Sequence, residues 1–433
     1  TINLGDSLIM RKRKEIISWA FYDWANSAYS TTVMAGFFPL FFEKFWSNPE
    51  DVIQSTYQLG IANSISSVVI ALLAPVLGAF ADRGSLKKKL LITFAFLGSI
   101  MTGALWFVGK GNWELAVFFY VMATIGFMAG NVFYDSLLPA VAKRSEFDYV
   151  SSLGYSLGYL GGGLLFMVNV FMYLSPQSFG IPDSTTAIKL SFVSVALWWG
   201  IFSLPILLFL PEPSKDNGLP IKDAIIGGFE QLAETYKNIR EMKTIGTFLL
   251  AFWLYEDGVA TIVRMAGKIA SSLGFAAGDI ITAILLVQFI GFPASLAYNW
   301  FGKKIGTKNA VLVAIMGYGI ITLLGYLMTS IKHFYMLAAL IGLFQGGIQS
   351  LSRSLFTRLV PKNKEAEFFG FYNMLGKFAA VVGPILVGWI TLYTGNARTG
   401  ILSIVVLFLM GGFLLMRVDF EKGELIANEF NRN

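Results

Sequence analysis

Polar side chains recur at helical spacing inside an otherwise apolar segment near the start of the chain. They lie at positions i, i+3, i+4, i+7 and i+8, which share one face of a helix: Asp23, Asn26, Ser27, Ser30 and Thr31. A charged side chain at the centre of a bilayer costs about 2.5–3.5 kcal/mol even on insertion-based scales, so it normally faces water or a partner group. This polar stripe therefore predicts a hydrated, functional face, with Tyr22 beside it.

Three further apolar segments carry polar stripes of the same kind. They comprise Asn131 and Asp135; Asp257, Thr261 and Arg264; and Gln345, Gln349, Ser352 and Arg353. Glu256 adjoins Asp257, and about 100° of helical rotation separates neighbouring residues, so the two carboxylates cannot share a face. We expect Asp257, which shares its stripe with Thr261, to face the functional side, and Glu256 to pair with a neighbouring helix.

The elements that must position these stripes are membrane-spanning helices. Hydrophobic residues make up 55% of the chain and charged residues 14%, against about 25% charged in soluble domains. A bilayer core requires roughly 20 apolar residues per helix. The sequence predicts an all-α membrane protein with twelve spans: 18–42, 57–81, 90–109, 114–139, 149–174, 187–211, 244–266, 279–301, 309–330, 334–357, 366–393 and 399–417. The first apolar segment is too long for a signal-peptide core, so we expect it to be retained.

The positive charges lie in alternate loops. Lys and Arg gather at 11–14, 82–89, 143–144, 215–243, 303–308, 358–364 and the C-terminal tail. This positive-inside pattern places both termini and the long central loop in the cytoplasm. It also explains the net charge of +6 without nucleic-acid binding. There is no cysteine and no phosphate-binding loop pattern, so we expect no cofactor, no metal centre, no enzymatic activity and no direct use of ATP.

The chain reads as two related halves. "YDSLLPAVAKRSEFDYVSSLGYSLGYLGGG" (134–163) resembles "SRSLFTRLVPKNKEAEFFGFYNMLGKFAAVVG" (352–383) in its Ser-Leu pair, basic loop and glycine-bearing helix. We therefore divide the chain into a six-helix half at 1–211, a linker at 212–243 and a second six-helix half at 244–433, related as parallel repeats. Apolar residues in the linker recur at helical spacing and predict an amphipathic helix, with a solvated linker helix as the alternative: Ile225, Phe229, Leu232, Tyr236 and Ile239.

Several strings carry a family resemblance. "FYDWANSAY", "SSLGYSLGYLGG", "LYEDGV" and "GGIQSLSRSLFTRLVP" are similar to those of the vacuole-effluxer-like, autophagy-related branch of the major facilitator superfamily. The resemblance implies a twelve-helix secondary transporter whose first, fourth, seventh and tenth helices line one central cavity, so the four stripes would converge there. Eukaryotic members are associated with amino-acid export from the vacuole, whereas bacterial relatives are largely without assigned substrates.

The resemblance also implies a gate. "GAFADRGSLKKK" (78–89) is similar to the superfamily's loop 2–3 motif, in which Asp82 and Arg83 would latch the cytoplasmic helix ends; the alternative is a simple positive-inside loop. In the second half Lys303 stands where the acid would stand, so only one half is expected to make an acid-based latch. The spacing of Gly154 and Gly158 predicts close helix packing.

The stripe residues suggest specific roles. Asp23 is the first candidate for a coupling acid, because a partly dehydrated carboxyl can bind and release a proton. Arg353 could grip a substrate carboxylate while Asp135 receives an ammonium group; alternatively, the two form an ion pair that closes the inward gate. Lys377 is expected to pair with a carboxylate, and Trp19 to anchor its helix at the membrane interface.

Three functions remain open from the sequence. The first is proton-coupled transport of small polar or zwitterionic metabolites, amino acids foremost, by a monomer in a bacterial inner membrane. The second is export of amphipathic drugs or lipids, which would require a wide aromatic cavity. The third is a membrane sensor that has lost transport. The intramembrane charges argue against the third function, because they are costly in lipid without a use.

Overall fold

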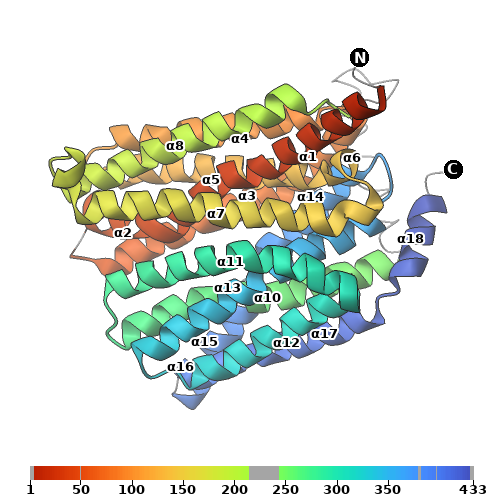
Figure 1. The fold of residues 1–433 in the computed structure, drawn as a ribbon. Coiled ribbons are helices and arrows are strands. Elements are labelled where there is room, and N and C mark those ends of the chain that lie inside the picture. The colour runs from red at the N-terminus through yellow and green to blue at the C-terminus, as the bar shows by residue number, and fades with distance from the viewer. Residues whose placement is uncertain (1–3, 49, 214–242, 379–381, 396, 430–433) are drawn as a thin grey trace.

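The computed structural model describes residues 4–48, 50–213, 243–378, 382–395 and 397–429, and this part of the chain contains helices and no strand (Figure 1). In chain order the elements are α1 (Leu4–Ala28), η1 (Tyr29–Phe37), α2 (Phe38–Phe41), η2 (Phe42–Trp46), α3 (Val52–Gly84), α4 (Lys87–Ala104), η3 (Leu105–Phe107), α5 (Trp113–Ser136), α6 (Leu138–Val141), η4 (Arg144–Glu146), α7 (Phe147–Leu174), η5 (Pro176–Phe179), α8 (Ser184–Phe209), α10 (Lys243–Ser272), α11 (Ala277–Ile305), α12 (Thr307–Tyr326), α13 (Ile331–Leu359), α14 (Glu365–Phe378), α15 (Val382–Thr394), α16 (Ala397–Leu402), α17 (Ile404–Arg417) and α18 (Phe420–Glu429).

The described residues of each of the twelve predicted segments are mainly helical. Ten described segments are long and apolar enough to cross a bilayer. The two predicted spans outside this set are the first, which carries the polar stripe, and the eleventh, whose described residues belong to α14 and to the shorter apolar helix α15. The first segment continues from α1 into η1, which has the wider π-helical turns often found at functional sites.

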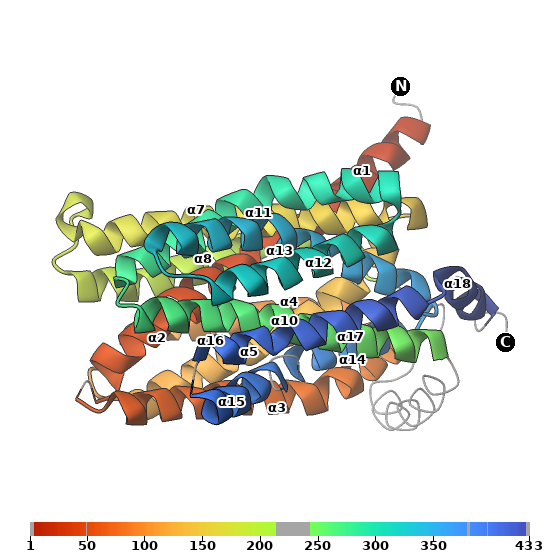
Figure 2. The same cartoon turned by 90° about the horizontal axis from the view of Figure 1, so that it is seen from below.

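The helices form two bundles that lie side by side (Figure 1). One hydrophobic core joins α1, α3, α4, α5, α7 and α8, and another joins α10 to α13 with α14 to α17. Both termini lie at the same end of the long axis, which we call the termini end (Figure 2). The predicted linker helix falls within 214–242, outside the described residues.

Side-chain caps start several of the long helices. Asp51 accepts a hydrogen bond from the backbone N–H of Gln54 at 2.9 Å, and Asp183 does the same for Thr186 at 2.8 Å. The Ser330 hydroxyl accepts from the N–H of His333 at 3.3 Å. Such caps satisfy N–H groups that have no partner within the helix. These caps fix the residues at which α3, α8 and α13 begin, and so the position of each later side chain along its helix.

Candidate functional site

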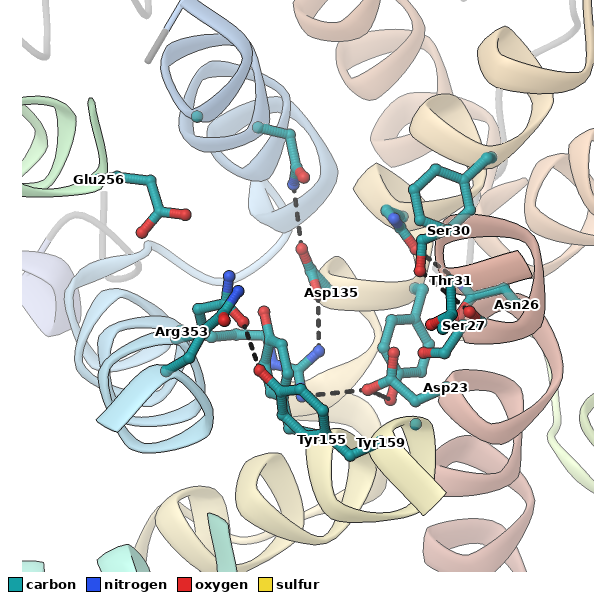
Figure 3. A pocket seen from close by; sticks show the side chains of 18 of the residues that line it. Asp23, Asn26, Ser27, Ser30, Thr31, Asp135, Tyr155, Tyr159, Glu256 and Arg353 are labelled. Carbon is teal, nitrogen blue, oxygen red and sulfur yellow. Dashed lines mark hydrogen bonds and ion pairs between the residues drawn. The ribbon is translucent and has the colours of Figure 1, made fainter. Parts of the chain in front are cut away.

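A cavity of about 350 Å³ lies between the two bundles (Figure 3). Its polar lining consists of Asp23, Asn26, Ser27, Ser30, Thr31, Asn131, Asp135, Glu256, Gln288, Gln345, Gln349, Arg353 and Asn373. Its aromatic lining consists of Phe127, Tyr134, Tyr155, Tyr159, Phe252 and Tyr372. Small-molecule sites commonly span roughly 300–1,000 Å³, so the cavity has the size of a metabolite site.

The stripe of the first helix faces this cavity along its whole length, because all five of its members line it. The neighbouring α5 contributes Asn131 and Asp135, and Asn131 accepts a hydrogen bond from the Asn26 amide at 2.7 Å. From the second bundle, α13 contributes Gln345, Gln349 and Arg353. Three of the four stripes therefore converge, except that Ser352 of α13 does not line the cavity and instead hydrogen-bonds with Tyr255 at 2.7 Å. The part these residues play in binding stays a prediction.

The stripe of α10, which consists of Asp257, Thr261 and Arg264, is rotated from its predicted position. The expectation that Asp257 faces the cavity is wrong. Glu256 lines the cavity, on the side opposite Asp23 (Figure 3), whereas Asp257 is buried beside it. The Asp257 carboxylate accepts hydrogen bonds from the backbone N–H groups of Val382 and Gly383, both at 2.9 Å, and from Thr261 at 3.2 Å. Asp257 thus binds the backbone N–H groups of the first two described residues of α15.

Arg353 joins the two bundles at the termini side of the cavity. Its Nη1 donates to Asp135 Oδ1 at 3.0 Å, and its Nη2 lies 3.5 Å from Asp23 Oδ2. Its Nε donates to Ser151 Oγ and its Nη2 to the Ser151 carbonyl, both at 2.9 Å. Of the two sequence interpretations, this geometry corresponds to the ion pair between the halves, with Asp23 as a second acid.

The surroundings of Asp23 depend on a close approach of helices. Tyr134 donates its hydroxyl hydrogen to Asp23 Oδ2 at 2.9 Å. A Cβ on Gly154 would lie 2.8 Å from the same oxygen, and one on Gly158 would lie 2.6 Å from Ser27 Oγ. Glycine at both positions therefore lets α7 pack against α1, as their spacing predicted.

Two aromatic residues of α1 depart from expectation. Trp19 is fully buried rather than at the membrane interface: it stacks on Tyr134 with ring centroids 4.3 Å apart, and its indole N–H donates to the Tyr134 carbonyl at 2.9 Å. Tyr22 is also fully buried, packs against Tyr134 and does not line the cavity. Neighbouring residues on a helix point in directions about 100° apart. Tyr22 therefore faces away from the cavity, although it is next to Asp23 in the sequence.

The predicted gate residues lie where α3 meets α14. The Asp82 carboxylate accepts hydrogen bonds from the backbone N–H groups of Ala366 at 3.2 Å and Glu367 at 2.9 Å, and it pairs with Lys87 at 2.8 Å. Lys87 also pairs with Glu365 at 2.6 Å. Arg83 is half-buried in the last turn of α3. Asp82 therefore holds the start of α14, across the boundary between the bundles.

Sequence analysis missed a second contact of this kind, centred on Asp148. Its carboxylate accepts hydrogen bonds from Thr307 Oγ1 at 2.6 Å, from Arg358 Nη2 at 3.0 Å and from the Ser354 hydroxyl. Thr307 begins α12, shortly after the last turn of α11, where Lys303 stands in the place of the motif's acid. The acid of this second contact lies in the first turn of α7, in the first bundle, and its partners belong to α12 and α13 of the second bundle. The repeat at 134–163 contains Asp148, but its partners are far away in sequence.

Other cavity residues also escaped the sequence patterns. Tyr155, Gln288 and Asn373 line the cavity from α7, α11 and α14. Gln288 donates to Thr31 Oγ1 at 3.2 Å, and Asn373 donates to Asp135 Oδ2 at 3.0 Å. Gln288 and Asn373 are single polar residues without a stripe, so no periodicity marked them; Tyr155 and Tyr159 lie four residues apart on α7, a spacing that sequence analysis did not use. The side chain of Lys377, in α14, lies outside the described part of the structure.

Comparisons with known proteins agree with this architecture. Residues 52–148 and 142–428 match the family model described as vacuole effluxer Atg22 like. The chain is 36% identical over 426 residues to the uncharacterized MFS-type transporter YxiO of Bacillus subtilis, covering 98% of this chain and 99% of that protein. It is 25% identical to autophagy-related protein 22 of Yarrowia lipolytica, covering 83% of this chain and 75% of that protein.

Solved structures share the fold. The human organic anion transporter MFSD10 (TETRAN) superposes with a TM-score of 0.72 at 15% identity, covering 93% of this chain and 99% of that one. The proton:xylose symporter XylE superposes with a TM-score of 0.70 at 13% identity, covering 98% and 100%. The chain is thus an integral, multi-pass membrane transporter of the major facilitator superfamily, and it belongs to the vacuole effluxer Atg22-like family.

Proposed function

We propose that the chain is a secondary active transporter that moves small polar or zwitterionic metabolites, amino acids foremost, by alternating access. The observation that carries this proposal is the cavity itself, which brings carboxylates, a guanidinium and side-chain amides from both bundles around one space of about 350 Å³. Amino acids present one group for each of these chemistries. A wide, mainly aromatic cavity, as expected for amphipathic drugs or lipids, fits this lining less well.

The contacts between the bundles support a state closed at the termini end. Hydrogen bonds and ion pairs join the bundles from the cavity to that end, through Asp82, Asp135, Asp148 and Arg353. With the termini in the cytoplasm, as the positive-inside pattern predicts, this state would face the outside of a bacterial inner membrane. Transport requires a second state in which these contacts are broken.

Proton coupling is assigned to Asp23. Its carboxylate lines the cavity and also lies 3.5 Å from Arg353 Nη2, so it belongs both to the substrate space and to the closing contact. Protonation would remove the charge that attracts Arg353 and would weaken the closed state. A proton and the conformation of the transporter would then be linked through one carboxyl group.

The test is uptake by the purified protein, as a monomer, in liposomes. A labelled amino-acid mixture is supplied with and without an imposed proton gradient, for the wild type, Asp23→Asn and Glu256→Gln. We expect gradient-stimulated uptake that Asp23→Asn abolishes and that Glu256→Gln reduces through a higher KM. Asp183→Asn is the matched control, because Asn caps helices as well as Asp and Asp183 lies at the start of α8, outside the cavity lining.

Two outcomes would count against the proposal. Absence of uptake above empty liposomes, with the protein folded and inserted, would refute amino-acid transport for that mixture and favour amphipathic cargo or sensing. Gradient-stimulated uptake that survives in Asp23→Asn would keep transport but remove Asp23 as the coupling acid.

A further inference from the structure

The guanidinium of Arg353, a residue of the second bundle, is bound by acceptor groups of the first bundle. The acids and the peptide group that bind it, Asp23, Asp135 and Ser151, belong to α1, α5 and α7 of the first bundle. Arg353 itself is 2% exposed. The first bundle therefore presents a complete acceptor set for one planar cation, and a side chain of the other bundle fills it.

Aromatic rings of the first bundle complete this acceptor set. The Arg353 guanidinium carbon lies 4.3 Å from the ring centroid of Tyr155, 4.9 Å from that of Trp19 and 5.2 Å from that of Tyr134. These distances fall within the range for cation–π attraction, roughly up to 6 Å. We call Trp19, Asp23, Tyr134, Asp135, Ser151 and Tyr155 the cation cage.

Three residues of the cation cage, Trp19, Tyr134 and Asp23, contact one another independently of Arg353. Trp19 stacks on Tyr134 and donates its N–H to the Tyr134 carbonyl, and the Tyr134 hydroxyl donates to Asp23. When the bundles part at the termini end, α13 withdraws Arg353 and the cage stays with the first bundle. Asp23 and Asp135 then lose the positive charge of Arg353 from their surroundings, and this loss is costly in a poorly hydrated site.

We propose that the cation cage is the binding site for a guanidinium group of the substrate, and that Arg353 occupies it as an internal ligand in the closed state. Asp23, Asp135 and Tyr155 also line the cavity, so a substrate there lies next to the cage. Substrate and Arg353 would compete for one site, which couples binding to opening at the termini end. This inference rests on the proposed alternating access and narrows its substrate class to cationic metabolites.

Direct binding to a vacated cage tests the inference without transport. We would titrate purified Arg353→Ala protein in nanodiscs with agmatine, with L-arginine and with L-citrulline, whose neutral urea group replaces the guanidinium. We expect saturable binding of the two cations, at least about tenfold tighter than that of citrulline, because charge-assisted hydrogen bonds are lost with the charge. The triple variant Arg353→Ala, Asp23→Asn, Asp135→Asn should lose this binding.

Arg358→Ala is the matched control, because Arg358 also joins the bundles but pairs with the carboxylate of Asp148, outside the cage. Agmatine should bind Arg353→Ala more tightly than it binds Arg358→Ala. Equal binding by the two variants, or binding that persists in the triple variant, would overturn the assignment.

A second measurement uses a protein in which Arg353 is retained, in case its removal prevents folding. The chain has no cysteine, so Ser152→Cys gives a single reporter in α7, where Ser152 is fully buried and bonded to Ser350 across the bundles at 3.2 Å. Agmatine should raise the rate of maleimide labelling at least about threefold and saturably by displacing Arg353, whereas citrulline should not. Unchanged labelling by agmatine would overturn the inference, even if neutral amino acids are transported.

Discussion

The Asp148 contact allows a quantitative prediction about the equilibrium between conformations. Asp148→Ala removes the hydrogen bonds from Thr307 and Ser354 and the ion pair with Arg358. Hydrogen bonds to charged groups contribute about 1.5–3 kcal/mol each when buried. The side chains of Arg358 and Asp148 are 23% and 12% exposed, however, and screening by water reduces such a pair towards about 1 kcal/mol or less.

Asp148→Ala removes this stabilisation from the closed state alone, because water solvates the side chains of Asp148, Thr307, Ser354 and Arg358 in the open state. We take the resulting change in the free-energy difference between the closed and open states as about 2 kcal/mol. This change corresponds to roughly a 30-fold shift of the equilibrium towards the state open at the termini end. In the Ser152→Cys background, the rate of maleimide labelling reports the open fraction when opening and closing are fast relative to the chemistry. Asp148→Ala should therefore label roughly 30-fold faster.

Asp279→Asn is the control for this experiment. Its carboxylate accepts hydrogen bonds from Tyr335 and from the N–H of Ala276, all within the second bundle, so the labelling rate should not change. An increase below about threefold in Asp148→Ala, or an equal increase in Asp279→Asn, would refute the assignment of Asp148 to the closing contact.

Two further predictions concern stability. Gly383→Ala places a Cβ against Thr261 Oγ1 and 2.8 Å from Asp257 Oδ1, whereas the Cβ of Gly388→Ala on the same helix meets open space. In thermal unfolding, we expect Gly383→Ala to lower the free energy of unfolding by about 1–3 kcal/mol and Gly388→Ala to leave it nearly unchanged. Similar losses in the two variants would contradict the close contact of Asp257 with the start of α15. Burial raises the pKa of Glu212, whose carboxylate accepts hydrogen bonds from the backbone N–H groups of Lys88 and Lys89, both at 3.0 Å. Since its folded-state pKa is the higher one, its contribution to stability is complete below the unfolded-state pKa and is lost as the pH rises through the folded-state pKa. When Tm is measured as a function of pH, Glu212→Gln should not show the decrease that the wild type shows. Parallel Tm–pH curves for the variant and the wild type would show that Glu212 does not titrate as described.

The sequence by itself determined the membrane-spanning helices and most of the cavity face. Lipid cannot satisfy backbone hydrogen bonds, so an apolar segment of spanning length must be helical. A polar stripe at a 3.6-residue period is likewise a local property, and it identified the faces of the first, fourth and tenth spans that line the cavity. Neither inference depends on residues elsewhere in the chain.

The tertiary structure alone decided which charges meet. The ion pair of Arg353 with Asp135, 218 positions apart, was one of two alternatives that the sequence left open. The partners of Asp148 lie in the other bundle, and no spacing within a helix relates them to it. Asp257 turned away from the cavity because its acceptors are satisfied by backbone N–H groups at the start of α15, which every residue type except proline provides. Side-chain periodicity reports the face that a residue occupies; the group opposite that face is set by how the helices pack.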